Sequence, residues 1–130
     1  MLRGFATINY WADDLEAAVA WYTEVLGIEP YFRVDGYVEF RVGDYRHELG
    51  LVDGRYRYAD SDGRPAGPVQ FWHVDDVRAS YRRLLDLGAT PVQEPIERGE
   101  GFVPAAVRDP FGNVLGIMEN AHYLEVLAER

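Results

Sequence analysis

Residues 11–27 read WADDLEAAVAWYTEVLG, and residues 73–88 repeat the same pattern as HVDDVRASYRRLLDLG. Each stretch has an Asp-Asp pair, then apolar residues at helical spacing, then Leu-Gly. The second aspartate of each pair, Asp14 or Asp76, can cap the start of a helix, and the glycine stands where the helix should end. The sequence therefore predicts two similar modules, one in each half of the chain.

Both predicted helices are flanked by short segments with strand-like alternation. The expected strands are Phe5 to Trp11, Pro30 to Val34, Tyr37 to Val42 and Tyr45 to Val52 in the first half, and Val69 to His73, Thr90 to Gln93, Phe102 to Val107 and Val114 to Met118 in the second. Gly43-Asp44 predicts a two-residue hairpin turn, and DPFGN at 109–113 predicts a turn before the last strand. Each half then reads β-α-β-β-β, an α+β fold.

The 130 residues are interpreted as a single domain with two modules. Module 1 is expected at about 1–53 and module 2 at about 68–119. The polar, Gly-rich stretch 54–67 predicts a linker between them, and 120–130 a C-terminal tail with a short helical pattern.

Composition excludes several classes of function. The chain has no cysteine, so it has no disulfide and no thiolate site. Its net charge of −9 argues against a nucleic-acid partner. No apolar run is long enough to span a membrane, and the N-terminus lacks signal-peptide features, so a cytoplasmic location is expected.

The two βαβββ modules, the helix DLEAAVAWYTEVLGI and the DPFGN turn before a last strand resemble the vicinal oxygen chelate superfamily. That superfamily includes glyoxalase I, extradiol dioxygenases and bleomycin-resistance proteins. The resemblance covers essentially the whole chain. It implies a curled mixed sheet around a cleft with the helices outside, and a homodimer.

Metal-dependent members of that superfamily take ligands from the first and last strands of each module. Counting from the shared motifs places the four positions at Thr7, Glu48, Val69 and Gly116. Valine and glycine offer no side-chain donor, threonine is a poor neutral donor, and a site needs about three suitable donors. We therefore expect no divalent metal and no other cofactor.

Glu48 is the single candidate for a catalytic residue, as a general base, or else as a hydrogen-bond acceptor for a ligand. Arg46 lies two residues earlier in the expected strand, hence on the same face, and could pair with Glu48 or hold an anionic ligand. The simpler alternative for this pair is a salt bridge at a strand edge.

The contribution of the three histidines stays open, because a hydrogen-bonded core or surface histidine is the simpler interpretation for each. His47 should point to the face opposite Glu48, unless the register slips by one residue. His73 shares a face with Val69 but lies roughly 13 Å further along the strand, at ~3.3 Å per residue. His122 is in the tail, where it could fold over a cleft.

The pleat also predicts which residues line the cleft. The expected ligand-binding set is Phe5, Thr7, Asn9 and Trp11 from the first strand, Arg46 and Glu48 from the fourth, Val69, Phe71 and His73 from the fifth, and Gly116 and Met118 from the last. Trp72 should lie behind the sheet. Gly116 favours a pocket, since it removes bulk from the wall.

Three functions remain open. The first is a metal-free, non-catalytic protein that binds an aromatic or antibiotic-like small molecule, as in the bleomycin-resistance branch. The second is a divergent metal-dependent lyase, isomerase or dioxygenase, and the third is a ligand-free dimeric interaction module. The missing metal ligands favour the first, whose partner would be a small molecule rather than a membrane or a nucleic acid.

Overall fold

The structure is a computed structural model that describes residues 1, 3, 5–57 and 69–130. The chain divides into two compact units, residues 1–63 and residues 64–130. Most of the predicted linker, residues 58–67, lies outside the described residues.

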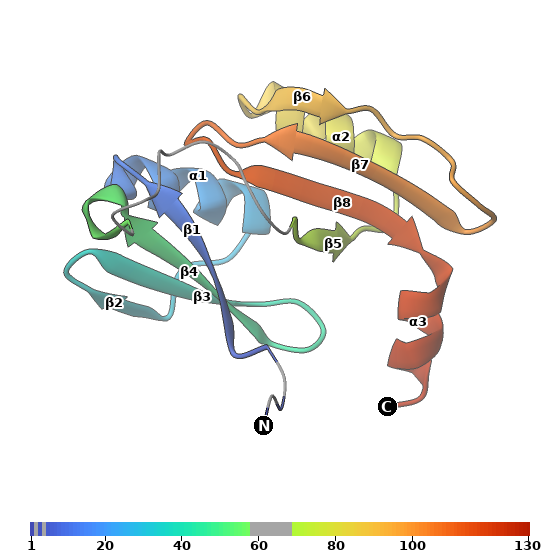
Figure 1. Ribbon diagram of the computed structural model, residues 1–130, viewed down its shortest axis with the longest axis horizontal. Coiled ribbons are helices and arrows are strands. Elements are labelled where there is room, and N and C mark those ends of the chain that lie inside the picture. The colour runs from blue at the N-terminus through green and yellow to red at the C-terminus, as the bar shows by residue number, and fades with distance from the viewer. Residues whose placement is uncertain (2, 4, 58–68) are drawn as a thin grey trace. The chain divides into compact units, whose positions relative to one another are not determined.

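The first unit is a βαβββ module with a four-stranded mixed sheet (Figure 1). Its elements are β1 (Thr7–Ala12), α1 (Leu15–Leu26), β2 (Phe32–Val34), β3 (Tyr37–Val42), β4 (His47–Asp53) and the 3-10 turn η1 (Gly54–Tyr56). The strand order is β1-β4-β3-β2, with β1 parallel to β4 and the other pairs antiparallel.

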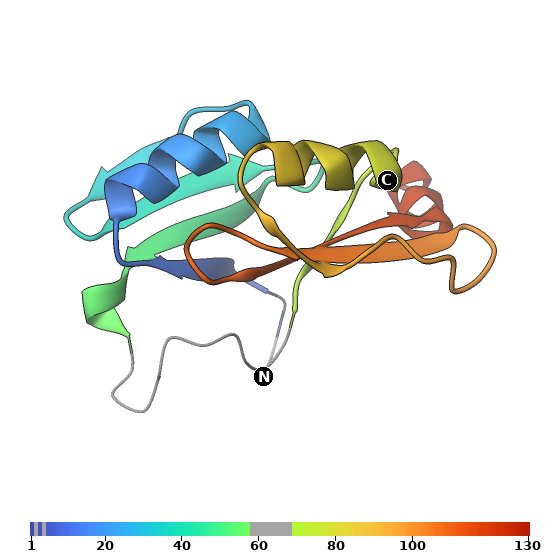
Figure 2. The same ribbon diagram turned by 90° about the horizontal axis from the view of Figure 1, so that it is seen from above.

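Helix α1 forms where the sequence predicts it and covers one face of this sheet (Figure 2). The Asp14 side chain accepts a hydrogen bond from the backbone N–H of Ala17 at 3.0 Å, and Gly27 ends the helix in the left-handed region at φ 69°. The buried ring of Tyr22 lies 5.6 Å from that of Tyr10. The alternate residues of β1, β3 and β4 that share this face with Tyr10 form the core, as the pleat predicts.

The second unit repeats the module and adds a C-terminal helix. Its elements are β5 (Phe71–His73), α2 (Val77–Asp86), β6 (Thr90–Gln93), β7 (Phe102–Arg108), β8 (Val114–Asn120) and α3 (Ala121–Ala128). The strand order is β5-β8-β7-β6, with β5 parallel to β8. Val77, Tyr81 and Leu84 of α2 are buried, and Asp76 caps that helix by accepting from the N–H of Ala79 at 3.0 Å.

The DPFGN turn before β8 is built around a buried carboxylate. Asp109 is only 3% exposed. Its Oδ1 accepts from the backbone N–H groups of Phe111 and Asn113 at 2.9 and 2.8 Å, and its Oδ2 accepts from the Asn113 side-chain amide at 2.8 Å. Gly112 supplies the left-handed residue at φ 96°. Phe111 and Asn113 of the motif thus supply hydrogen-bond donors to one buried carboxyl group within a tight turn.

The two βαβββ modules and the α+β class are confirmed, while four strands begin two residues later than expected. Strand β1 begins at Thr7 and β5 at Phe71, so Phe5 and Val69 lie before the strands that they were expected to join. The β3–β4 connection spans residues 43–46 rather than two residues, because Val42 pairs with His47. The curling of both modules around a shared cleft stays a prediction. None of the helices in the described ranges has the length and apolarity that crossing a membrane requires.

Candidate functional site

The sheet face of the first unit that α1 leaves uncovered carries a group of polar and aromatic side chains. The strand register aligns them in three rows: Thr7, Glu48 and Arg41; Asn9, Gly50 and Glu39; and Trp11, Val52 and Tyr37. Side chains in one row point to the same face. We call these residues, together with the neighbouring Tyr31, the polar face.

Glu39 is the most constrained carboxylate on the polar face. The hydroxyl groups of Tyr31 and Tyr37 both donate to it, one to each carboxylate oxygen, with Tyr37 at 2.5 Å. Partial burial raises the pKa of Glu39 above its ordinary value, the nearby Glu48 charge raises it further, and Arg41 opposes both. Glu39 is therefore a fixed acceptor that holds two phenol rings in place.

Arg41 links this cluster to Glu48. Its Nη2 lies 3.6 Å from Glu48 Oε1, and its Cζ lies 4.4 Å from the centre of the Tyr31 ring, a cation–π distance. The expected partner, Arg46, lies in the β3–β4 turn at φ 55°, outside the strand. The prediction that Arg46 shares the face of Glu48 is wrong, because the longer turn removes Arg46 from the pleat.

Gly50 allows the polar groups to gather in the middle row. A Cβ at this position would overlap the Asn9 side-chain oxygen and would come within 2.6 Å of the Tyr37 hydroxyl oxygen. The Thr7 hydroxyl is within 3.3 Å of the Glu48 backbone oxygen and 3.4 Å of Asn9 Oδ1. The Glu48 carboxylate keeps only the long contact to Arg41 among the described residues, and it is 38% exposed. Glu48 is therefore the less constrained of the two carboxylates on the polar face.

The equivalent face of the second unit carries apolar residues and one histidine. Phe71 pairs with Gly116 and His73 pairs with Met118, so these four residues share one face, while Trp72 pairs with Ile117 behind them. A Cβ on Gly116 would lie 2.6 Å from Phe71 Cδ1 and 2.7 Å from the Gln70 carbonyl oxygen. The Phe71 ring thus packs directly over Gly116. That Gly116 forms part of a pocket wall stays a prediction.

The remaining predicted residues do not join the polar face. Phe5 is 96% exposed and Val69 is 40% exposed, both outside strands. His47 pairs with Val42, on the helix-facing side of its sheet, and its ring stacks on Tyr45. His122 is exposed on α3, 3.4 Å from a Glu125 carboxylate oxygen.

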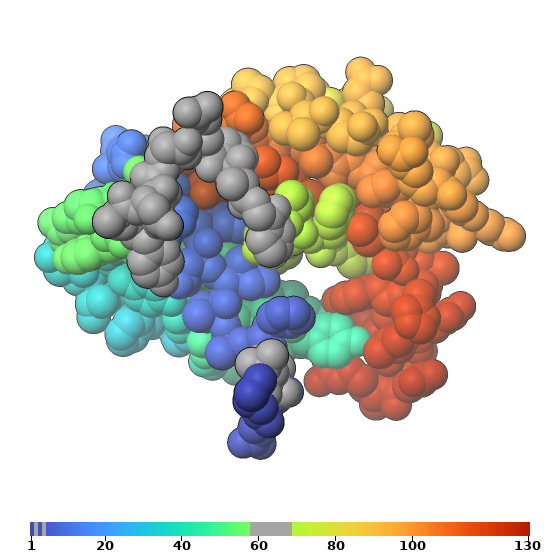
Figure 3. All heavy atoms as spheres, viewed as in Figure 1, coloured from blue at the N-terminus to red at the C-terminus, as the bar shows by residue number. Residues whose placement is uncertain are grey.

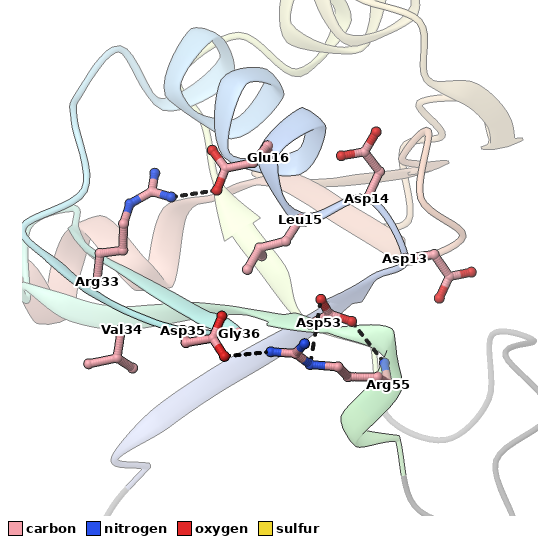
Figure 4. A pocket seen from close by; sticks show the side chains of 10 residues that line it. All are labelled: Asp13, Asp14, Leu15, Glu16, Arg33, Val34, Asp35, Gly36, Asp53 and Arg55. Carbon is pink, nitrogen blue, oxygen red and sulfur yellow. Dashed lines mark hydrogen bonds and ion pairs between the residues drawn. The ribbon is translucent and has the colours of Figure 1, made fainter.

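A separate open pocket of about 820 Å³ lies at the start of α1 (Figure 4). Arg33 bonds Glu16 at 2.6 Å, and Arg55 bonds Asp35 at 2.9 Å. The other carboxylates that line it are engaged as well: Asp13 with Arg57, Asp14 with the N–H of Ala17, and Asp53 with the N–H of Arg55. Because each carboxylate has a cationic or backbone partner, this network ties the β2–β3 turn and η1 to the helix start.

The residues at the four family metal positions do not fit a metal ion. Glu48 is the one carboxylate among them, beside Thr7, Val69 and Gly116. Within residues 1, 3, 5–57 and 69–130, no group of three or more His, Cys, Asp or Glu side chains could hold one.

The fold is that of an α+β protein with two βαβββ modules, the first of which carries the Glu48 carboxylate on its polar face. The family model of the Glyoxalase/Bleomycin resistance protein/Dioxygenase superfamily matches residues 4–117, and the chain belongs to this family. A comparison with curated proteins gives no match.

Several solved structures are similar to the chain. A glyoxalase-related enzyme from Fulvimarina pelagi shares 22% identity at a TM-score of 0.74, over 90% of this chain and 88% of that one. A glyoxalase/bleomycin resistance protein/dioxygenase family enzyme from Burkholderia phytofirmans shares 19% at 0.71, over 87% and 95%. A lactoylglutathione lyase from Agrobacterium tumefaciens shares 27% at 0.65, over 88% and 92%.

Proposed function

We propose that this protein binds a small aromatic ligand on the polar face of the first unit, without a metal and without catalysing a reaction. The observation that carries the proposal is the Glu48 carboxylate, which is partly exposed and keeps a single long contact to Arg41. It stands among fixed aromatic side chains, which give a flat ligand both a hydrogen-bond acceptor and ring surfaces.

The charge of the polar face indicates the ligand's chemistry. Two carboxylates, Glu39 and Glu48, stand beside one guanidinium, that of Arg41. Glu39 is already satisfied by two phenols, so Glu48 is the group that would meet a cationic or hydrogen-bond-donating part of the ligand. The overall charge of −9 would favour the approach of a cation.

A thermal-shift screen tests this proposal. Aromatic amines would be compared with neutral and anionic aromatics of the same size, since a ligand that binds only the folded state raises its melting temperature. The proposal expects shifts from the amines that disappear in Glu48→Gln, which keeps the size of the side chain and removes its charge. Equal shifts for all three classes, or for Glu48→Gln and the parent protein, would contradict it.

A divergent lyase, isomerase or dioxygenase is the second candidate. Two of the similar structures are described as enzymes, which favours this candidate. The Glu48 carboxylate, at one of the expected metal-ligand positions, also favours it. A ligand-free interaction module is the third, and it predicts no shift with any compound.

We also propose a cytoplasmic homodimer, of about twice the 14.8 kDa chain mass. Exposed edge strands tend to pair with other chains. A two-fold symmetric dimer interface would cover the edges of both sheets. Light scattering at micromolar concentration should report the dimer, and a monomer at every concentration would remove this part of the proposal.

A further inference from the structure

His73 at the end of β5 is a buried histidine with no hydrogen-bond partner among the described residues. Its side chain is only 10% exposed, and both ring nitrogens are buried and unpaired. The nearest carboxylate oxygen, Asp75 Oδ1, is 3.5 Å from Nε2 without hydrogen-bond geometry. A buried polar group without a partner costs free energy, so this state of His73 calls for an explanation.

The group that covers His73 is an aromatic ring from the C-terminal helix. The Tyr123 ring of α3 lies parallel to the imidazole, with 4.6 Å between centroids and 9° between planes. Met118 pairs with His73 in the register and lies on the same face. The flat phenol ring of Tyr123 is thus held against the imidazole of His73, a surface that suits any flat aromatic ring.

Helix α3 lies on the surface of its own unit. It has eight residues, and none of them is buried. Leu124 and Val126 are 47% and 41% exposed, and the α3 atoms stand out from the second unit beyond the end of β8 (Figure 3). A helix this short is marginal without packing, so it belongs to the low-stability end of the structure.

We propose that Tyr123 is a displaceable occupant of an aromatic-binding subsite formed by His73 and Met118, and that a flat phenolic ligand takes its place when α3 moves away. A ligand whose polar atoms reach the ring edge would pair the imidazole nitrogens that Tyr123 leaves unpaired. This subsite uses only residues of the second unit. Its test therefore does not depend on whether a ligand binds to the polar face of the first unit.

The test uses p-cresol, the side-chain analogue of tyrosine, titrated into the full-length protein by calorimetry or NMR. Tyr123→Ala should bind p-cresol at least about tenfold more tightly than the parent protein, a difference of about 1.4 kcal/mol. The matched control is Leu124→Ala, which shortens an exposed side chain on the same helix and should show no gain. Adding His73→Ala to Tyr123→Ala should remove the gain. Equal binding by Tyr123→Ala and Leu124→Ala would overturn the proposal.

Hydrogen exchange of the unmodified protein gives a test that does not depend on how a variant folds. The α3 amides should exchange at least about tenfold faster than those of β8, because the helix opens locally. Excess p-cresol should raise the α3 rates further by competing for the subsite. Exchange of α3 as slow as that of β8 would show that Tyr123 does not leave, and would overturn the proposal.

Discussion

Arg41 and Glu48 face each other across the β3–β4 pair, with 3.6 Å between Arg41 Nη2 and Glu48 Oε1. Arg46, two residues before Glu48, lies instead in the turn at φ 55°. The charge that accompanies Glu48 on the polar face therefore comes from the neighbouring strand.

Replacing Arg41 should change ligand binding, while replacing Arg46 should not. Arg41→Gln removes the cation beside Glu48 and frees that carboxylate for a cationic ligand, so we expect amine binding to tighten by a few-fold, within about 1 kcal/mol. Arg46→Gln removes the same charge from the exposed turn and is the matched control. Calorimetric titration of both variants measures the difference, and equal effects would show that only net charge matters.

Adding a methyl group at Gly116 should destabilise the protein. A Cβ there would come within 2.7 Å of both the Phe71 ring and the Gln70 carbonyl oxygen, so Gly116→Ala should cost about 1–3 kcal/mol through overpacking. Gly99→Ala is the control, since a Cβ at Gly99 has nothing within 4 Å and its φ is ordinary. Urea unfolding measures both variants, and equal stabilities would contradict the placement of Phe71.

The stability effect of Glu39→Gln should depend on pH. Burial and Glu48 raise the pKa of Glu39 in the folded state above 4.5, so the folded protein binds more protons than the unfolded chain just above that pH. The carboxylate then lowers the free energy of unfolding as pH rises through the folded-state pKa.

Glutamine lacks this titration, so Glu39→Gln should gain stability relative to the parent protein as pH rises from about 4.5 through the folded-state pKa of Glu39. Glutamine also offers the two phenols one acceptor oxygen fewer. This changes the free energy of unfolding by an amount that does not depend on pH. Glu97→Gln, in an exposed loop, controls for the removal of one negative charge. Urea unfolding at several pH values gives the difference, and the same pH dependence in both variants would refute the role of the Glu39 environment.

A ligand on the polar face should change the emission of Trp11 and leave that of Trp72 nearly unchanged. Trp11 pairs with Val52 in the row beside Asn9 and Gly50, while Trp72 pairs with Ile117 on the opposite face of its own sheet. Proteins that keep one tryptophan, with the others changed to Phe, would be titrated with a compound from the screen. A response from Trp72 alone would place the ligand elsewhere.

The helices and their ends could be predicted because their signals are local. Asp14 and Asp76 act as caps on backbone groups three residues away, and the DPFGN turn satisfies its own carboxylate. Such interactions need only a few neighbouring residues, so the pattern alone identifies them.

The polar face could be predicted only in part, because it depends on the length of one turn. A two-residue turn at Gly43-Asp44 would place Glu48 opposite Glu39, whereas the observed connection 43–46 places it opposite Arg41. Both turns suit a glycine at position 43. The spacing of Tyr37, Glu39 and Arg41 at every second residue of a strand was the sequence pattern that could have placed these side chains on the polar face. The Phe71 ring over Gly116 depends on side-chain packing, which the sequence pattern does not specify.

We propose that Glu48 contacts the ligand directly and that no metal ion takes part in binding. Calorimetric titration of one amine from the screen, before and after the protein is treated with a chelator, tests it most directly. We predict the same dissociation constant in both titrations, less than one equivalent of Zn, Ni, Mn or Fe in the protein, and about tenfold weaker binding by Glu48→Gln. Stoichiometric metal that is lost in Glu48→Ala, with ligand binding abolished by the chelator and restored by the ion, would contradict the claim and favour the metal-dependent enzyme.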